Sequence, residues 1–138
     1  MNDIFLDTSY AIASVSPKDQ LHRKAKRWTN QIASSNIPII TTQAILLEIG
    51  DAFSRSRFRN VGIGFLENLE SDINTTIISL TDELYDKAFE LFRNQPDKEW
   101  GLVDCISFVV MRERGIDDAL TADEHFVQAG FRALLRED

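Results

Sequence analysis

The first strong hydrophobic pattern in the chain is the run Ile4-Phe5-Leu6, which stops at Asp7 and is followed by Thr8 and Ser9. Consecutive apolar residues are typical of a parallel strand that is covered on both faces. A helical pattern begins at the two hydroxyl residues, so Asp7 is predicted to lie at the carboxyl end of a buried strand. In open α/β sheets ligands bind at this edge, because the loops there leave a crevice toward which helix N-termini point.

Helix-like and strand-like patterns alternate along the rest of the chain. Apolar residues three to four positions apart predict helices, and short β-branched runs predict strands. Thr41 or Thr42 can cap one helix and Thr81 another, while Gly115 is suited to end a third. The predicted strands are 4–6, 37–41, 75–80, 119–121 and 131–135, and the predicted helices are 8–14, 20–35, 43–55, 61–71, 82–94, 104–114 and 123–129. Such alternation favours an α/β fold with a parallel sheet.

The length and composition of the chain are consistent with this fold. A chain of 138 residues with 43% hydrophobic residues is predicted to form a single soluble domain over residues 1–138 without disulfides or metal staples. The single cysteine, Cys105, lies in an apolar run and is expected to be an inert buried thiol. Neither a membrane span nor an export signal is predicted, so the expected location is the cytoplasm.

A net charge of −7 argues against a general nucleic-acid binder, which neutralises phosphates with clustered Lys and Arg. It leaves a metal-dependent nuclease open, because cations held by carboxylates carry the positive charge in such a site. Basic residues would then be needed locally. Arg55, Arg57 and Arg59 surround Phe58, and this segment is predicted either to contact phosphates or to be a solvated loop.

Four acids occur at predicted element boundaries or in apolar surroundings: Asp7, Glu48, Asp104 and Asp123. Each has an ordinary alternative role, since Glu48 can face water and Asp104 or Asp123 can cap a helix. Together they offer the hard oxygen ligands that Mg²⁺ or Mn²⁺ prefers, and the lack of Cys/His clusters argues against zinc. Carboxylates that lie close together repel one another. A fold that gathers four of them is therefore better explained by metal binding than by a contribution to stability.

At these residues the sequence resembles the PIN domain family, and more narrowly the VapC-type toxins of bacterial toxin–antitoxin pairs. The resemblance rests on Phe5–Ser9, Leu47-Glu48-Ile49, Asp104 and the segment from Leu120 to Phe126. It implies a three-layer α/β/α domain around a central parallel sheet of about five strands. It also implies a ribonuclease that uses Mg²⁺ or Mn²⁺ and leaves a 5′-phosphate and a 3′-hydroxyl.

The resemblance assigns roles to particular residues. It implies that the four acids are the catalytic metal ligands, and that Thr8 or Ser9, together with Thr121, orients the acids or the metal-bound waters. Two positions depart from the family pattern. Val103 stands where many relatives have Thr, and His125 stands where some have a further acid, so metal affinity is expected to differ.

The same resemblance implies an RNA substrate, a small cognate antitoxin and a homodimer. The segment from Ala44 to Leu69 adds a physical hint, because it has more apolar residues than two short helices need for core packing, including Phe53, Phe58 and Phe65. An exposed patch of this kind would suit the dimer interface, the groove for an antitoxin helix, or both.

Other classes of protein also place an acid after the first strand. A dehalogenase-like phosphatase would require a second Asp at position 9, where this chain has Ser9, and a receiver domain would require paired acids and a later Lys at a strand end. The third alternative is an interaction module in which the acids only cap helices. A nuclease whose RNA-processing role lies outside any toxin–antitoxin pair also remains open.

Overall fold

Within residues 2–138, five parallel strands form the centre of the structure. The computed structural model describes residues 2–138, so Met1, the first residue of the predicted domain, lies outside the described part of the chain. The strands are β1 (Ile4–Leu6), β2 (Ile39–Thr42), β3 (Thr75–Ile78), β4 (Asp118–Leu120) and β5 (Arg132–Ala133). They lie in the order β3-β2-β1-β4-β5, and every neighbouring pair is parallel. In this order β1 lies in the middle, between β2 and β4.

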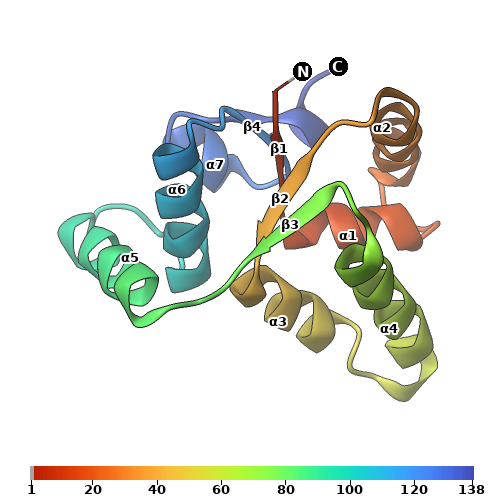
Figure 1. Ribbon diagram of the computed structural model, residues 1–138, viewed down its shortest axis with the longest axis horizontal. Coiled ribbons are helices and arrows are strands. Elements are labelled where there is room, and N and C mark those ends of the chain that lie inside the picture. Colours follow the sequence, from red (N-terminus) through yellow and green to blue (C-terminus); the bar gives the residue numbers. More distant parts are fainter. Residues whose placement is uncertain (1) are drawn as a thin grey trace.

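Helices cover both faces of this sheet, as the predicted α/β fold requires. They are α1 (Thr8–Val15), α2 (His22–Ser35), α3 (Gln43–Ala52), α4 (Ser56–Ser71), α5 (Asp82–Asn94), α6 (Leu102–Arg114) and α7 (Glu124–Gln128). Figure 1 shows α1, α2 and α4 on one side of the strands and α5, α6 and α7 on the other, with α3 below the end of β2. Because α3 contacts α1, α4 and α6, it lies beside the carboxyl edge of the sheet.

Local signals set most of the helix ends. The Thr42 hydroxyl accepts from the backbone N–H of Ile45, and the Thr81 hydroxyl accepts in the same way from Leu84. Gly115 ends α6 with a positive φ of 65°, a conformation that glycine adopts without steric cost. These caps were predicted from the sequence and are confirmed.

Several predicted boundaries are shifted by a few residues, and three of these errors change how a segment is interpreted. The helix α4 begins at Ser56, five residues before the predicted start, so two of the three arginines lie on a helix rather than in a loop. The helix α6 begins at Leu102, and Asp104 therefore lies in its first turn instead of at the N-cap, although its side chain still accepts from the N–H of Gly101, the N-cap residue. The last predicted strand, 131–135, shortens to Arg132–Ala133 and continues as a 3₁₀ turn.

The close packing of α4 on α3 explains why Gly62 did not prevent helix formation. A Cβ at this position would lie 2.5 Å from Cβ of Phe53, a distance that real side chains do not tolerate. Phe53 is consequently only 7% exposed. Tertiary packing thus compensates for the low helix propensity of glycine.

An aromatic cluster packs the helices α6 and α7 against the sheet. The ring of Phe108 from α6 packs edge-on against Phe126 from α7 at 5.0 Å, and Phe126 lies 6.3 Å from Phe5 of β1. Trp100 packs edge-on against Phe108, also at 5.0 Å. All four side chains are buried, and burying one such ring contributes about 1.5–3 kcal/mol. This packing fixes the N-termini of α6 and α7 close to the end of β1.

None of the helices found within residues 2–138 is both long enough and apolar enough to cross a lipid bilayer.

Candidate active site

Asp7 lies where predicted, directly after β1, and its side chain is held by hydroxyl groups. Oδ2 accepts a 2.7 Å hydrogen bond from Oγ1 of Thr121 and a 3.0 Å hydrogen bond from Oγ of Ser9. The backbone N–H of Asp7 also donates to the carbonyl of Leu120, at the end of β4. The residue is only 6% exposed. These bonds join the ends of β1 and β4 and fix one face of the Asp7 carboxylate.

Ser9 and Thr121 also bond to the loop that follows β4. The hydroxyl of Ser9 accepts from the backbone N–H of Ala122 at 3.0 Å, and Thr121 Oγ1 accepts from the backbone N–H of Asp123 at 3.0 Å. The two hydroxyls lie 3.2 Å apart. The predicted orienting residues therefore connect two of the four acids, Asp7 and Asp123.

Glu48 reaches the same region from the third helix. Oγ1 of Thr8, in the first turn of α1, donates a 2.7 Å hydrogen bond to Oε1 of Glu48. Glu48 is half-buried and does not project freely into water. Of the two hydroxyls at positions 8 and 9, one therefore holds Glu48 and the other holds Asp7.

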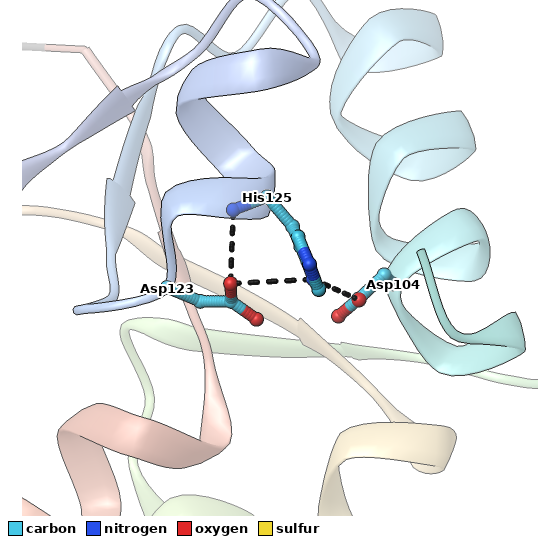
Figure 2. A group of neighbouring side chains, drawn as sticks. All are labelled: Asp104, Asp123 and His125. Atoms are coloured by element: carbon cyan, nitrogen blue, oxygen red, sulfur yellow. Dashed lines mark hydrogen bonds and ion pairs between the residues drawn. The ribbon is translucent and has the colours of Figure 1, made fainter. Parts of the chain in front are cut away.

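Asp104 and Asp123 come from the first turn of α6 and the N-cap of α7, and both contact His125 (Figure 2). Oδ2 of Asp104 accepts from the backbone N–H of Gly101 at 3.1 Å, and Oδ1 of Asp123 accepts from the backbone N–H of His125 at 2.9 Å. Nδ1 of His125 lies 3.1 Å from Oδ2 of Asp104 and 3.3 Å from Oδ1 of Asp123. Helix capping and membership of an acidic cluster therefore coexist at Asp123.

The charges of the four acids influence one another. Burial raises the pKa of Asp7, against the hydrogen bonds from Thr121 and Ser9, and the charge of Asp104 raises it further. Burial also raises the pKa of Glu48, and the charges of the other three acids add to this effect. The pKa of Asp104 is raised by burial and by the charge of Asp123. Without a counterion the site therefore disfavours full ionisation.

The donor set fits a divalent cation. The hydrogen bonds above use one oxygen of each acid, namely Asp7 Oδ2, Glu48 Oε1, Asp104 Oδ2 and Asp123 Oδ1. In residues 2–138 no buried side-chain oxygen or nitrogen lacks a partner, so none of the second carboxylate oxygens of these acids is both fully buried and unpaired. A ligand atom from each of Asp104, Asp123 and His125 lies within 4.8 Å of the other two. Convergent carboxylate oxygens of this kind suit Mg²⁺ or Mn²⁺.

The three candidate RNA-contacting arginines lie on the surface around the start of α4 and contact their own segment. Nη2 of Arg59 donates to the carbonyl of Ser54, and the guanidinium of Arg57 lies 4.9 Å from the centre of the Phe58 ring. Among the described residues, none of Arg55, Arg57 and Arg59 forms a hydrogen bond or ion pair with the four acids. Their role in RNA binding stays a prediction.

His125 is the residue of the cluster that the sequence did not assign to the site. Its position was noted only as a departure from the family pattern. A usable signal was present, because His125 lies two residues after Asp123 and in the first turn of the helix that Asp123 caps. At this spacing the imidazole ring lies close to Asp123, the N-cap residue of α7, and Asp104 from α6 contacts the same ring.

Comparison with known proteins gives matches along almost the whole chain. Residues 4–132 match the PIN domain family. Two curated relatives, both the "23S rRNA-specific endonuclease VapC20" from two strains of Mycobacterium tuberculosis, are 30% identical over 129 residues, which is 93% of this chain and 95% of each relative. The crystal structure of M. tuberculosis VapC20, described as a sarcin–ricin loop cleaving toxin, superposes with a TM-score of 0.82 at 27% identity, covering 94% of this chain and 97% of that one.

Proposed function

The chain belongs to the PIN domain family, and we propose that it is a metal-dependent endoribonuclease that hydrolyses RNA phosphodiester bonds as the toxin of a toxin–antitoxin pair. The observation that carries this proposal is the convergence of four acids at the carboxyl edge of the sheet, where their charges act on one another. The relatives that match over most of the chain are endonucleases, which supports the same activity here.

Under this proposal, Asp7 and Asp104 bind the cation directly, and Glu48 and Asp123 complete the site directly or through water. The cation is Mg²⁺ or Mn²⁺. When bound, it lowers the pKa of a water molecule and offsets the negative charge that develops on the scissile phosphate.

The side chains around the acids have a positioning task. Thr121 and Ser9 hold Oδ2 of Asp7, and Thr8 holds Oε1 of Glu48, so the remaining oxygens of these acids keep a fixed direction. Preorganised groups of this kind need little rearrangement when the substrate arrives. The burial of Asp7 limits the access of competing water.

The relatives suggest the first RNA to test. The full-length chain should be incubated with a sarcin–ricin loop oligonucleotide of 23S rRNA, with Mg²⁺ or Mn²⁺ and with EDTA. We expect cleavage only with a cation, and products that carry a 5′-phosphate and a 3′-hydroxyl. Unimpaired cleavage in EDTA would contradict the proposal. So would a 2′,3′-cyclic phosphate, because that product requires attack by the 2′-hydroxyl of the RNA itself.

A homodimer is the second part of the proposal. It is supported by apolar side chains that remain exposed on α3 and α4, namely Leu47, Phe58, Val61 and Ile63. Phe53, which the sequence suggested for this patch, is buried against Gly62 and does not contribute. Exposed apolar groups on neighbouring helices are typical of surfaces that pair with another protein.

The antitoxin has a candidate binding site in a cavity beside the sheet. This cavity of about 470 Å³ lies between α1, α2 and α4, and its apolar lining includes Leu6, Ile32, Phe65 and Leu69. Apolar side chains of an antitoxin helix would fit there. A basic side chain from the same antitoxin, pushed into the carboxylate cluster, would compete with the cation by direct charge attraction.

Co-expression with a small gene adjoining this one tests the partner. We expect the two proteins to purify together and RNA cleavage to be suppressed. If neither occurs while the purified chain still cleaves RNA, the protein is a PIN nuclease outside any toxin–antitoxin pair. Because the substrate is RNA inside the cell, the proposed place of action is the cytoplasm.

A further inference from the structure

The ring of His125 lies between the carboxylates of Asp104 and Asp123 (Figure 2). The two acids come from different helices, yet each directs an oxygen at the same ring nitrogen, with separations of 3.1 and 3.3 Å. The imidazole is about three-quarters shielded, with 26% of its side-chain surface exposed. His125 is therefore part of the acidic cluster and not a residue at its border.

The backbone holds the ring in this position. The N–H of His125 donates to Oδ1 of Asp123 in the first turn of α7, and Phe126, the next residue, is fully buried against Phe108 and Phe5. Asp104 is held in turn by the N–H of Gly101. The three donor atoms thus belong to elements that the core fixes relative to one another.

Hydrogen bonding alone does not fully account for the approach of two carboxylate oxygens to Nδ1 of His125. Nδ1 has one proton at most, and a single proton between two acceptors makes two weaker bonds. Adjacent ligands of an octahedral ion, at about 2.1 Å from the metal, lie about 3.0 Å apart, close to the observed separations. Asp104 Oδ2 has two lone pairs, so it can ligate a cation and still accept from Gly101.

We propose that Nδ1 of His125 is a direct ligand of the divalent cation, together with Asp104 and Asp123, and that this nitrogen shifts the preference of the site from Mg²⁺ toward Mn²⁺. The proposal rests on the metal-dependent function proposed above and specifies its cation. Carboxylates suit Mg²⁺ and Mn²⁺ alike, whereas imidazole suits transition metals better than Mg²⁺.

The test detects the bond between Nδ1 of His125 and the metal directly, and it does not depend on RNA cleavage. The full chain is loaded with Mn²⁺, and electron spin echo modulation records any directly coordinated ¹⁴N. The wild type is expected to show this nitrogen, and labelling with ¹⁵N-histidine is expected to change the signal to that of ¹⁵N. The variant H125N is expected to lose it.

His22 provides the matched control. The chain has two histidines, and Nδ1 of His22 lies 2.8 Å from the carbonyl of Ala13, in the contact between α1 and α2. The variant H22N is therefore expected to retain the nitrogen signal. A second variant, H125D, replaces the nitrogen by oxygen. We expect the ratio of its Mn²⁺ affinity to its Mg²⁺ affinity to fall below that of the wild type, because a carboxylate suits both ions whereas imidazole favours the transition metal.

The outcomes separate this proposal from the proposed function. If the wild type binds Mn²⁺ without coordinated nitrogen, His125 only hydrogen-bonds to the acids, and the metal-dependent nuclease stands without it. If the wild type binds neither Mn²⁺ nor Mg²⁺ in a titration, the metal site and this ligand both fail. Thermal unfolding of each variant shows whether loss of the signal reflects loss of the fold.

Discussion

Thr121 and Asp7 are 114 positions apart in the sequence, yet Oγ1 of Thr121 donates a 2.7 Å hydrogen bond to Oδ2 of Asp7. Both groups are buried, and the bond connects the ends of the neighbouring strands β1 and β4. It favours the ionised form of Asp7 in surroundings where burial opposes ionisation. This single contact therefore influences both the charge and the direction of a proposed metal ligand.

Replacing Thr121 by Val removes this hydrogen bond and keeps the shape of the side chain. We expect Mn²⁺ affinity and kcat/KM to fall by about 10- to 100-fold, the usual loss when a group that orients a metal ligand is removed. Metal titration and a cleavage assay measure the two effects. The control T76V changes an exposed threonine of β3 and is expected to leave both values unchanged. Wild-type affinity in T121V would contradict the orienting role of Thr121.

The proposed direct ligands should be more sensitive than the residues that orient them. In D7N and D104N we expect RNA cleavage to fall by more than about 100-fold, beyond the range for orienting groups. Circular dichroism should confirm that each variant is folded. The matched control is D51N, which changes an exposed acid of α3, the helix that carries Glu48. Substantial cleavage by D104N would remove Asp104 from the catalytic set.

The raised pKa of Asp7 predicts how the stability of the metal-free protein depends on pH. Because the folded state binds this proton more tightly than the unfolded state does, the contribution of Asp7 is fully present below its ordinary pKa of 3.8. It is lost as the pH rises through the higher folded-state pKa. We therefore expect D7N to gain in Tm relative to the wild type as the pH increases from 3 to 7. A constant difference in Tm across this range would contradict the raised pKa.

At neutral pH a bound cation should offset the repulsion between the carboxylates of the four acids. A cation at 100 times its Kd is expected to stabilise the wild type by about 2.7 kcal/mol, since it binds only the folded state. A thermal melt with and without EDTA measures this difference, and D7N should show much less of it. If Mn²⁺ and Mg²⁺ leave the Tm of the wild type unchanged at millimolar concentrations, the site does not bind them with useful affinity.

The arginines around the start of α4 are predicted to contact RNA phosphates. Replacing Arg55, Arg57 and Arg59 by Ala is expected to weaken RNA binding and to reduce the salt slope by up to about 2, given about 0.7 per phosphate contact with a single strand. Binding isotherms at several salt concentrations provide both quantities. The control removes Arg23, Lys26 and Arg27 from the exposed face of α2 and changes the net charge equally. Equal losses in both variants would indicate a general charge effect.

The exposed apolar residues of α4 are predicted to form part of a dimer interface. In the double variant F58D/V61D, buried charge would oppose association, and we expect a monomer at micromolar concentration. Light scattering over a dilution series gives the mass. The control I73D changes an exposed isoleucine between α4 and β3 and should leave the dimer intact. A wild-type monomer with full nuclease activity would contradict the dimer.

Much of the fold follows from signals that act over a few residues. The buried run at Ile4–Leu6, the cap at Thr81 and the glycine at Gly115 satisfy backbone groups or cover a strand within their own segments. The structures of these segments were therefore predictable without knowledge of the tertiary contacts. The position of Asp7 at a strand end was predictable for the same reason, and the alternation of elements indicated a parallel sheet.

The tertiary structure decided which of these groups meet. The strand order places β4 directly beside β1, which brings Thr121 to Asp7, and the packing of α3 against α1 brings Glu48 to Thr8. The close contact between Gly62 and Phe53 packs α4 against α3, and the inclusion of His125 depends on the aromatic contact of α7 with α6. These contacts join residues far apart in the chain, so their formation depends on loop closure and core packing, which no local pattern encodes.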